Sequence, residues 1–142
     1  MFTWRYDDAG RVPDGGFVLI RPYGEQGGGY GEGDGTVSGD RLRGTVVWSN
    51  HPGRRGDGRM LPDVHGLITT DDGAQILFEL RGRTVFNADR SRGGQGLIGT
   101  FEAADDRYTW LNDVVCIAEG VIRPDPNRIE VRVYEGVNEL LG

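Results

Sequence analysis

The stretch from Leu61 to Gly82 constrains the fold most strongly, because it carries the clearest hairpin signal in the chain. Two extended segments flank the short sequence Asp71-Asp72-Gly73. Glycine adopts a positive φ without steric cost, and aspartate tolerates the tight turn positions that precede it. The stretch therefore predicts two antiparallel strands joined by a short turn.

The length of this turn decides which side chains of the hairpin share a face. In a three-residue loop, Thr70 pairs with Ala74 and His65 lies directly opposite Glu79. In a two-residue loop, the second strand slips by one residue and His65 joins the apolar side chains. We favour the three-residue loop, because it separates apolar from polar side chains more completely. Either face could then line the interior of a closed sheet.

The rest of the chain also has the pattern of a β protein. Short apolar and β-branched runs alternate with turn residues, and 25 glycines are spread among them. A further strand is expected to turn back at Gly82, and no long segment has an amphipathic helical pattern. We predict an all-β chain of about nine or ten strands.

Without a helical layer to cover one face, such a sheet must close on itself or fold into a sandwich. We predict a single antiparallel closed β-barrel that occupies residues 1–142. A barrel of this size can hold one small ligand in its lumen. Three segments, 23–36, 50–60 and 88–97, are expected to form flexible loops near the barrel mouth.

The glycine-rich segment 23–36 has a second interpretation, a phosphate-binding loop. Such loops lie between a strand and a helix, where backbone amides meet the anion. No helix is expected here, and the segment carries Glu25, Glu32 and Asp34. These carboxylates favour an ordinary polar loop.

Composition argues against several classes of function. The net charge is −6 and the arginines are scattered, whereas a nucleic-acid partner requires a basic face. All 16 basic residues are arginine, which excludes a Schiff-base or Walker A lysine. The single cysteine, Cys116, permits no disulfide within the chain. No apolar run approaches the roughly 20 residues of a membrane span, and the N-terminus lacks a signal-peptide layout, so we expect a cytoplasmic protein without a membrane partner.

A further strand is expected to place Tyr108, Trp110 and Asn112 on one face. Tryptophan offers contact area to a planar ligand, and asparagine orients it through hydrogen bonds. These three residues, with Trp48 and Arg81, are the candidate substrate-binding residues. The alternative is plain core packing, with the amide of Asn112 satisfied by the backbone.

Four runs of the chain together resemble a known family. The runs are Gly39–Val46, Asp63–Ala74, Tyr108–Asn112 and Val133–Glu135. They are similar to the small lipocalin-like barrels catalogued as domain of unknown function 3237. The resemblance implies a calycin-type antiparallel barrel with an internal cavity, often oligomeric, and no particular reaction. The family often has arginine where His65 stands, and a titratable histidine suits proton transfer better than a permanent cation.

The sharpest catalytic hypothesis concerns His65 and Glu79. A carboxylate orients an imidazole, and the pair could then move a proton on a bound substrate. Asp63 is a candidate second catalytic carboxylate. The alternative is a cross-strand charge pair on a solvated face, with Asp63 as the partner of Arg81. We expect no metal site, because the two histidines do not have a metal-binding spacing such as His-x-His.

These observations predict a cofactor-independent enzyme that binds a small aromatic or polyketide-like molecule in the barrel lumen and catalyses proton transfer. Isomerases, cyclases and lyases of natural-product metabolism use this chemistry. A binding barrel without catalysis and a structural subunit with a filled barrel are the alternatives. The expected partners are the small molecule and further copies of the chain in a homo-oligomer.

Overall fold

The computed structural model describes residues 2–6, 17–20, 26–124 and 127–141, which form eleven strands and two short 3₁₀ helices. The strands are β1 (Phe2–Tyr6), β2 (Phe17–Ile20), β3 (Gly27–Ser38), β4 (Arg43–Asn50), β5 (Gly53–Arg54), β6 (Met60–Leu61), β7 (Asp63–Thr70), β8 (Gln75–Phe86), β9 (Gly93–Ala103), β10 (Val115–Pro124) and β11 (Asn127–Glu135). The 3₁₀ helices are η1 (Thr109–Asp113) and η2 (Glu139–Leu141).

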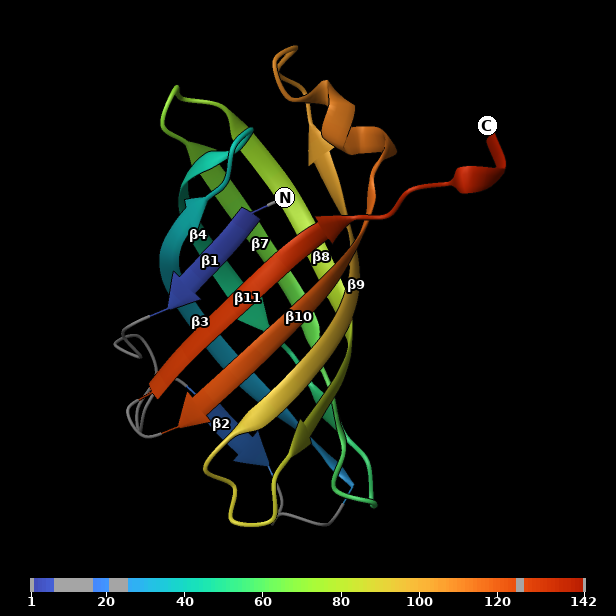
Figure 1. The fold of residues 1–142 in the computed structure, drawn as a ribbon. Coiled ribbons are helices and arrows are strands. Elements are labelled where there is room, and N and C mark those ends of the chain that lie inside the picture. Colours follow the sequence, from blue (N-terminus) through green and yellow to red (C-terminus); the bar gives the residue numbers. More distant parts are fainter. Residues whose placement is uncertain (1, 7–16, 21–25, 125–126, 142) are drawn as a thin grey trace.

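Eight of these strands close into an antiparallel barrel (Figure 1). The order around the barrel is β1–β3–β4–β7–β8–β9–β10–β11, and β1 closes the ring by pairing with both β11 and β3. β2 pairs with β3, while the two-residue strands β5 and β6 link β3 to β8. The prediction of an all-β closed barrel is confirmed, and the described residues contain no helix of seven or more residues.

The turn between β7 and β8 has the predicted three-residue form. The amide of Thr70 donates to the carbonyl of Ala74 at 2.9 Å, and the amide of Gly73 donates back to Thr70 at 3.0 Å. Gly73 has a φ of 92°, which a residue with a side chain rarely adopts. The register is therefore fixed as predicted, with His65 opposite Glu79.

The apolar face of this hairpin lines the interior of the barrel, and the ionisable face lies outside. Side chains from most of the barrel strands and from η1 point into the interior and form one continuous core. Burial raises the pKa of the Cys116 thiol, which belongs to this core. The largest fully buried side chains are Leu42, Val46, Ile68, Ile76, Leu80, Leu111, Cys116, Val131 and Val133.

The glycine-rich segment is a strand where the sequence predicted a loop. Residues 27–38 form β3, residue 26 is a bend, and residues 23–25 lie outside the described part of the chain. Gly31 and Gly33 are buried on the inner side of β3, and Gly33 pairs with Trp48 of β4. Since glycine has no side chain, its inner face leaves space beside a large indole. These glycines serve packing in the barrel wall.

The other two predicted loops are also partly strand. The segment 50–60 contains β5 and the first residue of β6, and β9 begins within the segment 88–97. The chain does not turn back at Gly82, because β8 continues through it to Phe86. β5 and β6 pair with strands distant in sequence, β3 and β8, whereas β9 pairs with β8, the strand directly before it.

Candidate functional site

Four ionisable side chains stand together on the outer face of the β7–β8 hairpin. Nε2 of His65 lies 3.0 Å from Oδ1 of Asp63, and Nε of Arg81 donates to the same oxygen at 2.9 Å. Nδ1 of His65 lies 3.9 Å from Oε2 of Glu79. The imidazole therefore lies between two carboxylates, and half of its surface is exposed to solvent, at 50%.

Asp63 is the centre of this group, because Arg81 and His65 both form hydrogen bonds with its carboxylate. A hydrogen bond from Arg81, reinforced by one from His65, lowers the pKa of Asp63, and the same Arg81–Asp63 bond raises the pKa of Arg81. Asp63 is thus a carboxylate at neutral pH and accepts a hydrogen bond from Nε2 of His65. We assign the Nε2–H tautomer from this hydrogen bond. Its Nδ1 lone pair faces Glu79 across a distance too long for a direct hydrogen bond.

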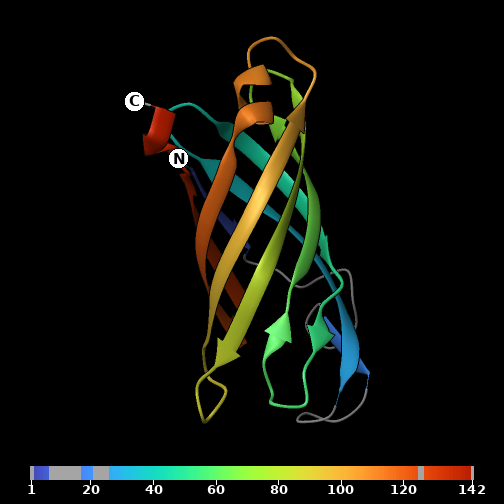
Figure 2. The same cartoon turned by 90° about the vertical axis from the view of Figure 1, so that its right-hand side faces the viewer.

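A groove of about 670 Å³ runs across the outer face of β4, β7, β8 and β9. Figure 2 shows β7, β8 and β9 side by side on the near side of the barrel. Strand pairing aligns one outward residue from each strand into two parallel rows, which form the walls of the groove. The apolar wall is Val47, Leu67 and Leu77, ending at Glu102, and the polar wall is Ser49, His65, Glu79 and Thr100.

The floor of the groove is the backbone of the inward-facing residues between these two rows. Trp48, Gly66, Phe78 and Phe101 form this floor. A Cβ at Gly66 would lie 2.3 Å from Cζ of Phe78 and 2.7 Å from the carbonyl oxygen of Val47. The ring of Phe78 therefore occupies the space that a side chain at position 66 would need.

Several groove residues were not among the candidates predicted from the sequence. Ser49 comes from β4, which pairs with β7 although β5 and β6 lie between them in the chain, and Thr100 comes from β9, which follows β8 across residues 87–92. The hydroxyl of Ser49 also lies 3.3 Å from Nε2 of His51. The sequence signal that could have located Ser49 is the alternation of side-chain direction along β4. Because Trp48 points inward, its two neighbours point outward.

The segment predicted to be a strand with a ligand-binding face is instead the 3₁₀ helix η1. The hydroxyl of Tyr108 donates to the carboxylate of Asp72 at 2.9 Å. The amide of Asn112 accepts from the backbone N–H of Ala103 at 2.7 Å and donates to its carbonyl at 2.9 Å. Both side chains form hydrogen bonds at one end of the barrel, and neither lines the groove.

The remaining substrate-binding candidates are also separated from one another. The guanidinium of Arg41 lies 3.6 Å above the ring of Trp110, which is a cation–π contact on η1. Trp48 is partly buried against the core and contributes only to the floor of the groove. Arg81 stands beside the groove and is engaged with Asp63.

The sequence predicted the ligand in the lumen, toward which the core side chains described above point. The ionisable residues and the apolar wall instead meet on the outer surface. Among the described residues, no group of three or more His, Cys, Asp or Glu side chains is arranged to hold a metal ion. No helix in the described ranges is long and apolar enough to cross a membrane.

The η1 end of the barrel is held by an ion-pair cluster of Asp72, Asp105 and Arg107. Arg107 lies 2.8 Å from Asp105 and 3.2 Å from Asp72. Hydrogen bonds from Arg107 lower the pKa of Asp105 to about 2. A hydrogen bond from Thr70, followed by one from Tyr108, lowers the pKa of Asp72.

This cluster predicts a loss of stability in acid. A carboxyl group with a lowered folded-state pKa stabilises the fold above its unfolded pKa, and that contribution is lost as the pH falls through the folded value. We expect the free energy of unfolding to decrease between about pH 4 and pH 2, measured by urea unfolding. Asp105→Asn should weaken this pH dependence, whereas Asp106→Asn, outside the cluster, should not. Equal slopes for the two variants would show that the cluster does not cause the loss.

Comparison with known proteins gives a family and a fold. A family model described as "Protein of unknown function (DUF3237)" matches residues 32–136, which is most of the chain. No curated protein shows significant similarity to the chain.

Three solved structures illustrate the shared fold. A β-barrel-like protein (ABAYE2633) from Acinetobacter baumannii AYE is 18% identical, with 95% of this chain and 92% of that chain covered and a TM-score of 0.78. A protein of unknown function from Clostridium acetobutylicum is 19% identical, with 96% of each chain covered and a TM-score of 0.80. An enzyme from Penicillium herquei is 22% identical, with 96% and 91% covered and a TM-score of 0.63.

Proposed function

The chain belongs to the family of proteins of unknown function DUF3237, and we propose that it is a cofactor-independent enzyme that catalyses proton transfer on a small molecule bound in the outer groove. The isomerase, cyclase and lyase classes share this chemistry. The enzyme from Penicillium herquei, which has a similar fold, supports a catalytic role.

The observation that carries the proposal is the position of His65 in the polar wall, between two carboxylates. Asp63, 3.0 Å from Nε2, holds the tautomer in which Nδ1 can accept a proton. Glu79, 3.9 Å from Nδ1, stabilises the imidazolium that forms. The imidazole removes a proton from a carbon beside a carbonyl group. The resulting enolate is then reprotonated at another atom, adds within the molecule, or expels a leaving group.

The two walls of the groove suit a flat molecule with an oxygenated edge. Val47, Leu67 and Leu77 offer apolar area to an aromatic or polyketide-like skeleton. The hydroxyls of Ser49 and Thr100 can donate hydrogen bonds to a carbonyl oxygen. The groove volume of about 670 Å³ falls within the range of roughly 300–1,000 Å³ that is typical of small-molecule sites.

A non-catalytic binding barrel is the second candidate function. Its supporting observation is the apolar wall, which provides contact area without any reacting group. In that case the four ionisable residues would serve solubility and strand pairing, as cross-strand charge pairs do.

A ligand screen with one matched pair of variants tests the location of the site. Among aromatic and polyketide-like compounds, we expect at least one to raise the melting temperature by about 5 °C or more at one hundred times its dissociation constant. Leu77→Arg should remove this shift, because Leu77 forms the apolar wall. Val85→Arg should keep it, because Val85 lies outside the groove on the same strand, with a similar exposed fraction of 49% against 55%.

The outcomes of the screen separate the candidates. A compound that binds and is turned over supports the enzyme, and one that binds without turnover supports the binding barrel. A shift that survives Leu77→Arg would place the ligand elsewhere. If no compound in the screen binds, the proposed substrate class is wrong.

A further inference from the structure

The apolar wall of the groove ends in a carboxylate. Strand pairing aligns Leu67 with Leu77 and Leu77 with Glu102, so Glu102 continues the row of apolar side chains onto β9. Glu102 is exposed, and it forms no hydrogen bond or ion pair within the part of the chain that the structure describes. Its charge is therefore available to a group at the end of a ligand that lies along the apolar wall.

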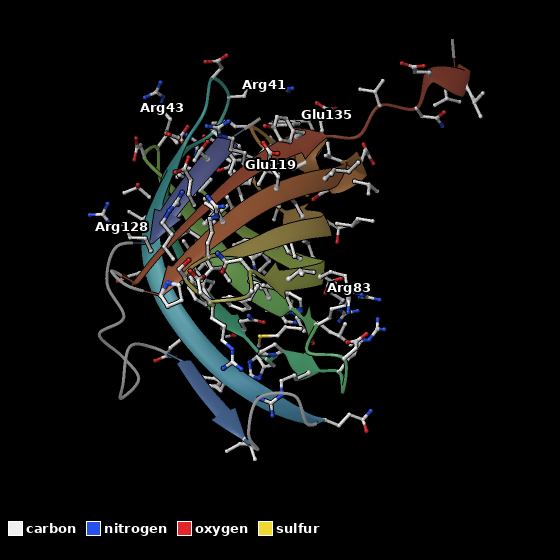
Figure 3. All side chains as sticks on the ribbon, turned by 60° about the horizontal axis from the view of Figure 1, so that its bottom comes forward. Arg41, Arg43, Arg83, Glu119, Arg128 and Glu135 are labelled. Atoms are coloured by element: carbon white, nitrogen blue, oxygen red, sulfur yellow. The ribbon has the colours of Figure 1, made fainter. Side chains whose placement is uncertain are left out.

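The charged side chains that line the groove give it a negative sign. Among the described residues of this lining, Glu79 and Glu102 are acidic and none is arginine, and the chain has no lysine. Arg81 stands beside the groove but donates to Asp63 at 2.9 Å. Arg83, farther along β8, points away from the barrel and donates to a backbone carbonyl (Figure 3). Because a cleft lined by charges of one sign attracts ligands of the opposite sign, this groove favours a cation.

The positions of His65 and Glu102 define the length of the ligand. The two residues lie on β7 and β9, two strands apart, and their rows are offset by two residues along the strands. With strands about 4.8 Å apart and a rise of about 3.3 Å per residue, their Cα atoms are separated by roughly 12 Å. Both side chains line the groove. A reacting carbon beside the imidazole and a cationic group beside Glu102 therefore fit a skeleton of two or three fused rings.

We propose that the groove selects substrates whose aromatic skeleton carries a protonated amine, and that Glu102 is the specificity-determining residue that binds this ammonium group. The inference rests on the proposed function and adds the charge of the substrate to it. The ammonium N–H donates to the carboxylate of Glu102 in a charge-assisted hydrogen bond, while the rings cover Leu67 and Leu77. A substrate with a carboxylate in the same place would be repelled, and apolar surroundings strengthen that repulsion. Glu102 takes no part in the proton transfer itself.

Three indole compounds with the same ring system test the selection by charge. At neutral pH, tryptamine carries an ammonium group, tryptophol a neutral hydroxyl group and indolepropionate a carboxylate. In calorimetric titrations at low salt, the dissociation constant of tryptamine should be about tenfold below that of tryptophol, and indolepropionate should bind more weakly than both. Added sodium chloride should reduce the preference for tryptamine, because salt screens exposed charges.

Substitutions of Glu102 test the residue that carries the selection. Glu102→Gln should weaken tryptamine binding by about fivefold, the upper end for one exposed ion pair, and leave tryptophol binding unchanged. Glu102→Arg should reverse the order, so that indolepropionate binds more tightly than tryptamine.

Two other carboxylates supply the controls. Asp34→Asn removes a carboxylate that pairs with Val47 at the opposite end of the same row, outside the groove lining. Glu135→Gln removes one at the end of β11, where the chain leaves the barrel (Figure 3). Each control changes the net charge by the same amount as Glu102→Gln, and neither should change tryptamine binding.

The inference is overturned if the three compounds bind equally, if indolepropionate binds best, or if none of them binds. It is also overturned if Glu102→Gln leaves tryptamine binding intact, or if either control weakens it as much. The proposed function fails separately. Tryptamine binding that depends on Glu102, without turnover of any amine-bearing carbonyl compound, contradicts the proton transfer alone. Turnover of a neutral compound that is unaffected by Glu102→Gln contradicts the selection by charge alone.

Discussion

Replacing His65 by glutamine is expected to lower turnover by about 100-fold to 10,000-fold, the range that general acid–base groups contribute. Glutamine keeps a polar side chain beside Asp63 and Glu79, so the shape of the groove is retained. It has no basic nitrogen, so the proton cannot be taken up. The dissociation constant of the ligand, measured by titration, should therefore change little.

The second histidine supplies the control. His51 contacts the hydroxyl of Ser49 at 3.3 Å and lies outside the groove lining. His51→Gln should retain nearly full turnover. Full activity in His65→Gln would remove the proton-transfer role from this residue.

Replacing Gly82 by alanine is expected to lower the free energy of unfolding by about 3 kcal/mol, the upper end of what overpacking typically costs. A Cβ at Gly82 would lie 2.0 Å from the carbonyl oxygen of Gly96 and 2.9 Å from Cα of Leu97. Both contacts are with the backbone of β9. A side chain could rotate away, but these atoms can move only if the β8–β9 ladder is distorted.

Gly96 provides a matched control on the neighbouring strand. A Cβ there would meet nothing within 4 Å. Gly96→Ala should leave stability nearly unchanged or raise it by up to about 1 kcal/mol, because alanine restricts the unfolded chain. Urea unfolding of both variants measures the difference. Similar midpoints for Gly82→Ala and Gly96→Ala would show that β8 and β9 do not approach this closely.

The β7–β8 hairpin shows which structural features the local sequence can predict. A turn of three residues specifies its own conformation, because only glycine readily takes the positive φ at position 73. That conformation fixes the register of the two strands it joins, so His65 opposite Glu79 could be predicted. The closed all-β fold was also predictable, because a chain without amphipathic helices has few other ways to cover a sheet.

Pairing between strands decided the features that the sequence did not reveal. The glycine-rich segment became β3 because it pairs with β4, and Gly82 became part of a continuous strand because β9 lies against it. The run from Tyr108 to Asn112 has a strand-like composition, but Asn112 is bound to the backbone of Ala103 and the segment turns as a 3₁₀ helix. No local rule states how far two consecutive strands will extend along each other.

The sequence by itself determined a closed β-barrel and the set of ionisable residues that meet across one hairpin. It did not determine on which side of the barrel wall that set would lie. The tertiary structure determines this side, because the apolar face of the hairpin packs with side chains from most of the other barrel strands. Burying that face leaves the imidazole outside, next to the outward residues of β4 and β9. The candidate site therefore lies on the outer surface, in a groove that exists only once four strands are aligned.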